Sequence, residues 1–252
     1  MLLTIDVGNT NTVIGCFEGE QLVESWRIKT DARATADEIA LLLRGLLQDE
    51  PAPTGIAACS TVPAVLHELR GVFDRYYADV PAVIVEPGVK TGVPILYDNP
   101  REVGADRIVN ALAAHHLFGG PAIVVDFGTS TNFDVVSERG EFLGGALAPG
   151  IEISVDALAA RAARLLKVEL VRPRSVIGKS TVEALQSGII YGFAGQIDGL
   201  VRRIATELEA EPVVVATGGL ATLVIDEAET ITEHEPDLTL IGLRLVFERN
   251  QS

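Results

Sequence analysis

The chain contains little cysteine and no long apolar run. Its 252 residues include only two cysteines, Cys16 and Cys59, which lie in apolar surroundings without a Cys-x-x-Cys pairing. A disulfide framework is therefore not supported, and we expect two reduced, buried thiols. No uninterrupted apolar stretch is long enough to span a bilayer, and the N-terminal residues reach Asp6 too early for a signal peptide. These absences predict a cytoplasmic protein with no membrane partner.

Basic residues are also few. The chain has 20 Lys and Arg against 35 Asp and Glu, which gives a formal net charge of -15. Such a surface repels nucleic acid, so we expect no nucleic-acid partner, and an anionic substrate would need a locally positive or N–H-rich pocket. The histidines share no metal-ligand spacing. A P-loop motif and the protein-kinase signature set are both missing, which argues against those mechanisms.

An internal repeat is the main feature that the chain does have. Residues 2–14 and residues 122–134 each place an apolar run before an Asp-x-Gly loop, so that Asp6 aligns with Asp126 and Gly8 with Gly128. Each loop leads to a second strand-like run, a turn and a third apolar segment. One such loop would be read as a hairpin turn, but two copies at half-chain spacing favour phosphate binding by loop N–H groups. Asp6 could also organise Mg²⁺ or its waters.

The remaining segments alternate between helical and strand patterns. Capping boxes at residues 35–38 and 180–183 open two helices, and Pro63 marks the start of another. Further helices are expected at residues 108–117, 153–166 and 238–247, and strands at residues 55–59, 82–85 and 213–216. This alternation predicts an α/β fold, which we divide into two lobes, residues 1–110 and 111–252.

Four motifs stand in a fixed order along the chain: residues 6–12, residues 104–107 (Gly-Ala-Asp-Arg), residues 126–129 and residues 144–150. Together they resemble the type III pantothenate kinases, and the duplicated pattern is that of the actin, sugar-kinase and Hsp70 group. The resemblance implies a duplicated ribonuclease-H-like (actin-like ATPase) fold with mixed sheets flanked by helices. It also implies a homodimer that phosphorylates pantothenate to 4′-phosphopantothenate with ATP and Mg²⁺, the first step of coenzyme A synthesis. Ser130-Thr131-Asn132 departs from the Ala-Thr-Thr of many members.

The resemblance assigns roles to individual residues. ATP binding falls to Asp6, Val7, Gly8, Asn9, Thr10, Asn11, Thr12, Val13 and Thr129. Pantothenate binding falls to Tyr97, Gly104, Ala105, Asp106, Arg107 and Thr181, with Asp106 as the general base. Asp126 corresponds to the ligand of a monovalent cation, K⁺ or NH₄⁺, and residues 144–150 to a turn that lines the acceptor pocket.

Simpler readings of these residues stand beside the family roles. On sequence alone, Asp106 favours a helix N-terminus, Arg107 is a solvated charge, Tyr97 packs on the surface and Thr181 belongs to a helix cap. Two other functions also stay open: another phosphotransferase or phosphatase of the superfamily, such as an acetate kinase or polyphosphatase, and a non-catalytic regulatory relative.

Overall fold

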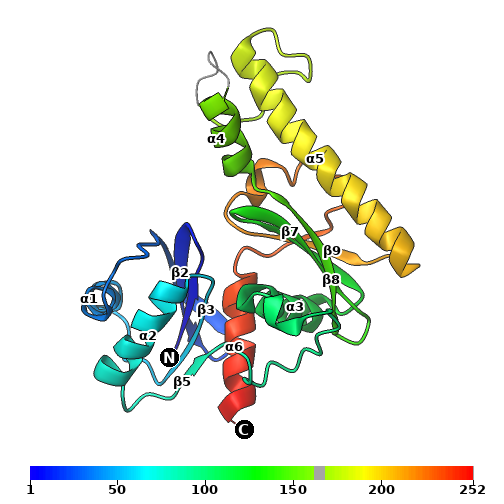
Figure 1. The fold of residues 1–252 in the computed structure, drawn as a ribbon. Helices are drawn as coiled ribbons and strands as arrows, with labels where there is room; N and C mark the ends of the chain where they lie inside the picture. The colour runs from blue at the N-terminus through cyan, green and yellow to red at the C-terminus, as the bar shows by residue number, and fades with distance from the viewer. Residues whose placement is uncertain (162–167, 252) are drawn as a thin grey trace. The chain divides into compact units, whose positions relative to one another are not determined.

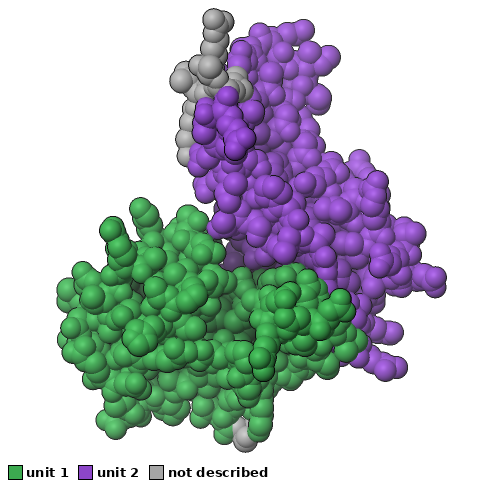
Figure 2. Space-filling view, in the orientation of Figure 1, with its two compact units in different colours: residues 1–113, 238–252 green, residues 114–237 purple. Residues whose placement is uncertain are grey.

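The computed structural model describes residues 1–161 and 168–251 (Figure 1). The chain divides into two compact units (Figure 2). Unit 1 comprises Met1–Ala113 together with the C-terminal segment that starts at Leu238, and unit 2 comprises Ala114–Asp237. This division differs from residues 1–110 and 111–252 chiefly at the C-terminus, because the last helix packs on the first sheet.

Unit 1 is built on a five-stranded sheet in the order β3-β2-β1-β4-β5. Strand β1 runs antiparallel to β2 and parallel to β4. The elements of this unit are β1 (Leu2–Val7), β2 (Asn11–Glu18), β3 (Gln21–Lys29), α1 (Ala36–Leu46), β4 (Gly55–Ser60), α2 (Pro63–Tyr76), β5 (Ala82–Ile84), the 3-10 helix η1 (Pro100–Glu102), α3 (Ala105–Phe118), which continues into unit 2, and α6 (Leu238–Gln251).

Unit 2 repeats the same strand order, read from the other edge as β10-β9-β6-β7-β8. Its elements are β6 (Ala122–Phe127), β7 (Ser130–Val136), β8 (Phe142–Pro149), α4 (Ile151–Arg161), α5 (Thr181–Leu208), β9 (Val213–Thr217), the 3-10 helix η2 (Ala221–Leu223) and β10 (Glu233–His234).

The repeat extends to the strand register. Asp6 pairs with Val13 across the first hairpin and Asp126 with Asn132 across the second. The first loop is therefore one residue longer, and Thr12 corresponds to Thr131 rather than to Asn132. The second hairpin strand carries a register shift in both units, at Cys16/Phe17 and at Val135/Val136. Shared irregularities of this kind support a duplicated unit more strongly than the loop motif alone.

Alternation along the first strand of each unit decides which side chains face the helices. In β1, Leu3, Ile5 and Val7 enter one buried cluster with apolar residues of α1 and α2. In β6, Ile123, Val125 and Phe127 enter the corresponding cluster with residues of α5. Because neighbouring side chains of a strand point to opposite faces, Asp6 and Asp126 both lie on the face turned away from these helices.

Helix α6 covers the second face of the unit 1 sheet. A Cβ on Gly55 would lie 2.2 Å from the Phe247 ring, and one on Gly15 would lie 2.7 Å from Leu240. Helix α6 also crosses α3 closely, since a Cβ on Gly242 would lie 2.2 Å from the Val109 carbonyl oxygen. These glycines allow the helix to approach the sheet, which explains why it belongs to unit 1.

Several local predictions can be checked directly. The capping box of α1 is confirmed, because Thr35 and Glu38 bond reciprocally. At α5, Ser180 accepts from the Glu183 N–H, but the Glu183 carboxylate accepts from the Lys179 N–H, so the box is only half formed. Both cysteines are free and buried.

The turn predicted at residues 144–150 is wrong. Residues up to Pro149 belong to β8, which pairs with β7 along its length. The glycines serve the strand itself, since a Cβ on Gly145 would lie 1.6 Å from the Phe133 carbonyl oxygen. The helix predicted at residues 153–166 begins earlier, at Ile151, and residues 162–166 lie outside the described part of the chain.

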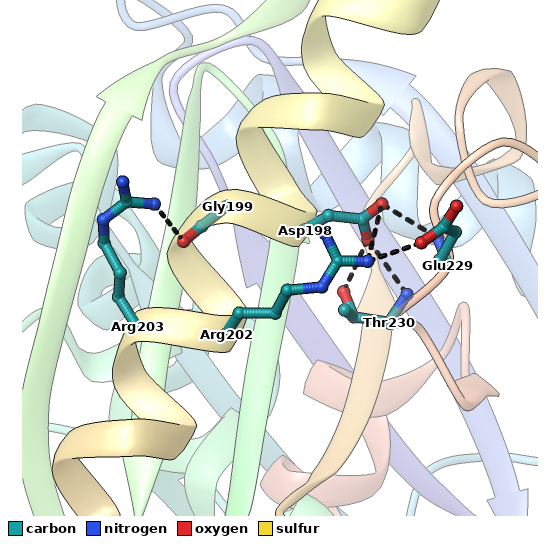
Figure 3. Close-up of polar contacts among 6 residues, drawn as sticks. All are labelled: Asp198, Gly199, Arg202, Arg203, Glu229 and Thr230. Carbon is teal, nitrogen blue, oxygen red and sulfur yellow. Dashed lines mark hydrogen bonds and ion pairs between the residues drawn. The ribbon is translucent and has the colours of Figure 1, made fainter.

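A buried carboxylate ties helix α5 to the segment before β10 (Figure 3). Asp198 accepts hydrogen bonds from the Thr230 N–H at 2.9 Å, the Thr230 hydroxyl at 2.8 Å and the Glu229 N–H at 3.2 Å. Arg202, one turn along the helix, pairs with Glu229. These bonds hold the segment that leads into β10. Among the described residues, no helix is long and apolar enough to cross a membrane.

Candidate active site

Asp6 lies at the carboxyl end of β1, between β2 and β4. Its neighbour on the parallel strand is Cys59, whose Sγ–H donates to Asp6 Oδ1 at 3.2 Å. Burial, and after it the negative charge of Asp106, raise the pKa of Asp6 to about 7, although the Cys59 hydrogen bond and the Arg27 charge act in the opposite direction. The carboxylate is therefore costly to ionise where it stands, and a bound cation would relieve that cost.

Asp106 lies in the first turn of α3. Burial raises its pKa, while the N–H groups of Arg107 and of Asp106 itself and the Arg107 charge act in the opposite direction. Gly104 is needed at this turn, because a Cβ there would lie 2.4 Å from Asp106 Oδ1. A raised pKa makes Asp106 a stronger base than an ordinary aspartate. The alternative prediction that Arg107 is a solvated charge is wrong, because this residue is buried.

The first hairpin loop exposes some of its residues and buries others. Asn9, Thr10 and Asn11 are exposed, and the loop is closed by a bond from the Gly8 N–H to the Asn11 carbonyl at 3.0 Å. Val7 and Thr12 are buried on the helix-facing side, so only their backbone groups can reach a ligand on the Asp6 side. Val13, the strand partner of Asp6, is half-buried.

Tyr97 belongs to the segment before α3. It is half-buried, and the following Asn99 caps η1 by accepting from the Arg101 N–H and donating to Glu102. Unit 1 thus contains Asp6, the loop, Tyr97 and residues 104–107, and the electrostatic interaction of Asp6 with Asp106 shows that two of these motifs lie close together.

Unit 2 contains the second Asp-x-Gly loop. Asp126 ends β6 beside Thr217 of β9 and Asn132 of β7. Gly218, at φ +91°, packs against it: a Cβ there would lie 2.6 Å from Asp126 Oδ1 and 2.7 Å from the Phe127 carbonyl oxygen. A side chain at position 218 would collide with these atoms and with the Phe127 backbone nitrogen at 2.7 Å, so glycine allows the chain to pack closely against the Asp126 carboxylate.

Thr129 lies exposed in this loop, and its carbonyl accepts from the Gly150 N–H at 3.1 Å. Gly150 has no room for a Cβ, which would lie 2.3 Å from the same carbonyl oxygen. At the sequence departure, the Ser130 hydroxyl donates to Asn132 Oδ1 at 2.6 Å. The altered residues thus form a bond of their own beside Asp126.

Thr181 is the exposed first residue of α5. The alternative prediction that Thr181 belongs to the helix cap is wrong, because the capping hydroxyl is that of Ser180. The Thr181 side chain is left on the surface at the N-terminal end of a helix.

One residue beside the site was missed by the sequence analysis. Cys59 was predicted only as a buried thiol, but it is the hydrogen-bond donor to Asp6. The available signal was its position as the last apolar residue of a strand-like run, which places it level with Asp6 in a parallel pair.

Comparison with known proteins finds a family that matches most of the chain. The family model for type III pantothenate kinase matches residues 2–203. The type III pantothenate kinase of Frankia casuarinae is 71% identical over 250 residues, which cover 99% of this chain and 100% of that protein.

Two solved structures share the fold. A Baf family protein of Campylobacter jejuni has a TM-score of 0.64 at 18% identity, covering 99% of this chain and 98% of its own. The ROK hexokinase of Thermus thermophilus has a TM-score of 0.54 at 15% identity, covering 99% and 98%. These likenesses confirm the predicted actin-like fold. From the family match and the Frankia identity, this chain belongs to the type III pantothenate kinase family.

Proposed function

We propose that this protein transfers the γ-phosphoryl group of ATP to the primary hydroxyl of pantothenate, giving 4′-phosphopantothenate for coenzyme A synthesis. The observation that carries the proposal is the pair of carboxylates, Asp6 and Asp106, which interact in unit 1 and both have a raised pKa. The family match over residues 2–203 and the full-length identity to the Frankia casuarinae type III pantothenate kinase argue against another phosphotransferase or phosphatase of the superfamily and against a non-catalytic relative.

Asp6 and its loop would hold ATP and Mg²⁺. The loop offers exposed N–H groups and small polar side chains at residues 9–11, which suit phosphate oxygens. The residues fit a divalent ion, because Asp6 is a partly buried carboxylate that is ionised at a cost in the ligand-free protein. Mg²⁺ takes few protein carboxylates together with phosphate oxygens. When bound, it would neutralise charge on the phosphates.

Asp106 would accept the proton of the pantothenate hydroxyl. Phosphoryl transfer through a loose transition state depends more on positioning than on base strength, and the first turn of α3 holds the carboxylate in place. Buried Arg107 supplies positive charge next to it. Gly104, Ala105, Tyr97 and Thr181 would complete the acceptor site.

Asp126 would bind the monovalent cation, and Thr129 would contact ATP phosphates. The position of Asp126 in the second repeat, at the same place in its hairpin as Asp6 in the first, supports this assignment. We further propose a cytoplasmic homodimer that binds neither membranes nor nucleic acid, in keeping with the net charge of -15.

An acceptor-dependent turnover assay tests the function. Purified protein with ATP, Mg²⁺ and pantothenate should form ADP and 4′-phosphopantothenate together, faster with K⁺ or NH₄⁺ than with Na⁺. ATP hydrolysis that ignores pantothenate would reject the acceptor. Equal rates with all three cations, or a cation preference that persists in Asp126→Asn, would reject the role of Asp126.

A further inference from the structure

Unit 1 contains a cavity of about 210 Å³ that the proposed reaction does not use. It is lined by residues of the sheet, of helix α1 and of helix α2. The residues that line it are mostly apolar: Ile5, Val7, Thr12, Ile14, Ile28, Lys29, Thr30, Asp31, Ala34, Glu38, Ile39, Leu42, Leu43, Val65 and Leu69.

The cavity is on the opposite face of the sheet from the candidate active site. Ile5 and Val7 line it, and Asp6 lies between them in the same strand. Side chains alternate across a strand, so the Asp6 carboxylate points away from the cavity. A molecule bound here would therefore not occupy the place of the substrate or of Asp106.

The two threonines of the lining connect this cavity to the loop at Gly8. Thr30 Oγ1 donates to the Gly8 carbonyl at 2.8 Å, and the Thr30 N–H donates to the Thr10 carbonyl at 2.9 Å. Thr12 Oγ1 lies 2.9 Å from Thr30 Oγ1. Because the Thr30 hydroxyl proton is committed to Gly8, Thr12 is the donor in this pair. The lone pairs of Thr12 Oγ1 remain able to accept from a ligand.

The charged residues of the lining make it unsuitable for an anion. Asp31 and Glu38 outnumber Lys29 there, and the Glu38 carboxylate is already used by the N–H and hydroxyl of Thr35. A cavity of about 150 Å³ with an apolar lining can hold benzene, so 210 Å³ has room for a substituted ring. The lining thus selects a small, uncharged, mainly apolar molecule that carries one hydroxyl donor.

We propose that this cavity is a second ligand site, for a small uncharged alcohol or phenol, and that its occupancy strengthens ATP binding. A donor to Thr12 would polarise the chain from Thr12 through Thr30 to Gly8. Ordering the loop before ATP arrives reduces the entropy that ATP binding must overcome. The coupling, unlike the site, rests on the proposed function, because it requires ATP at residues 8–12.

The site is tested with para-fluorophenol, observed by fluorine NMR and calorimetry on the nucleotide-free protein, with fluorobenzene as the matched probe that lacks the donor. We expect saturable binding of both, with the phenol about fivefold tighter because of one hydrogen bond. Ala34→Leu, which fills the cavity, should abolish binding, whereas Ala64→Leu on the exposed surface of α2 should not. Circular dichroism confirms that each variant is folded.

Thr12→Val provides a second test that needs no change of volume. It should remove the preference for the phenol over fluorobenzene. Absence of saturable binding, binding that survives Ala34→Leu, or a preference that survives Thr12→Val would each overturn the site.

The coupling is measured by ATP titration with and without saturating para-fluorophenol. We expect ATP to bind about twofold tighter or more, and the phenol to gain by the same factor. Unchanged ATP affinity overturns the coupling while leaving the site. A protein that binds the phenol but never binds ATP counts against the proposed function instead.

Discussion

At the scale of single residues, Asp6 and Asp106 lie close together but have different proposed roles. Both carboxyls have a raised pKa. For Asp6 this means that a bound cation would favour the ionised form, and for Asp106 it means a stronger base. Gly104 is the residue that makes room for the second carboxylate. Both aspartates can therefore be tested by isosteric amides, which keep the shape and remove the charge.

Asp106→Asn should lower kcat by about 100-fold or more, with little change in the KM for ATP, because the proton acceptor is lost while the ATP loop is untouched. Steady-state kinetics against pantothenate and ATP measure both constants. The matched control is Asp98→Asn, which removes an exposed carboxylate of the preceding segment and should keep wild-type kcat. A near-normal kcat in Asp106→Asn would remove the base assignment.

Asp6→Asn should stabilise the protein without Mg²⁺ while abolishing turnover. The pKa of the Asp6 carboxyl is higher in the folded protein than in the unfolded chain. The free energy of unfolding therefore falls as the pH rises from 3.8 to about 7. Such a pKa shift corresponds to at most about 4 kcal/mol of stability. Because the group is partly exposed and solvent screens its charge, we expect Asp6→Asn to gain about 1–2 kcal/mol.

Thermal unfolding in a chelator measures this effect. The Tm of Asp6→Asn should exceed that of the wild type at about pH 8, and the difference should disappear below about pH 4, where the unfolded chain is protonated as well. Added Mg²⁺ with ATP should raise the wild-type Tm and not that of the variant. An amide variant that is no more stable at any pH would contradict the raised pKa.

The sequence predicted Asp6 and Asp106 as site residues, since each stands in a short motif with a recognisable context. It could not show that the Thr12 side chain faces away from the Asp6 side, because that depends on where the strand begins after the loop. The role of Cys59 was also hidden, because the contact joins residues 53 positions apart. Burial, which sets both pKa shifts, is a property of packed elements and not of a motif.

At the scale of elements, the two hairpins and the capped helices followed from local patterns. The failures occurred where glycine has a packing role that sequence cannot distinguish from a turn. Gly145 allows β8 to pass close to β7, although glycines followed by proline usually indicate a loop. Helix α6 was found by its apolar pattern, but its partner sheet is far away in sequence.

Asp198→Ala should destabilise unit 2 by about 2–3 kcal/mol, because two partly buried N–H groups and a hydroxyl lose their charged acceptor. Asp198→Asn, which keeps one acceptor oxygen, should cost less. Denaturant unfolding measures the loss. Arg203→Ala is the control: this exposed side chain bonds only to the Gly199 carbonyl of its own helix in the contacts drawn in Figure 3. A loss no larger than in this control would show that the segment before β10 does not depend on Asp198.

At the scale of the whole molecule, the chain leaves unit 1 at Ala113 and returns to it at Leu238. The returning helix is almost entirely buried along one side, with Leu238, Leu240, Leu243 and Val246 among its buried residues. Unit 2, in contrast, is one continuous stretch. The two units therefore differ in how much they depend on the C-terminus.

Deletion of residues 238–252 should uncover one face of the unit 1 sheet and leave unit 2 folded. Hydrogen exchange read by mass spectrometry should show lost protection in β1 and β4 and retained protection in β6 and β9. The point variant Gly242→Leu, which forces α6 away from Val109, should give a milder form of the same pattern. Equal loss in both units would mean that they unfold together.

The return of α6 to the first sheet also sets an order for biogenesis. The strands of unit 1 are synthesised before unit 2, yet the helix that completes their packing is synthesised after it. Unit 2 has all of its residues available before that helix emerges, and domains fold as units during synthesis. The second copy of the repeat is therefore expected to mature first, and a nascent chain stalled before Leu238 would carry a finished unit 2 beside an open sheet that chaperones can recognise.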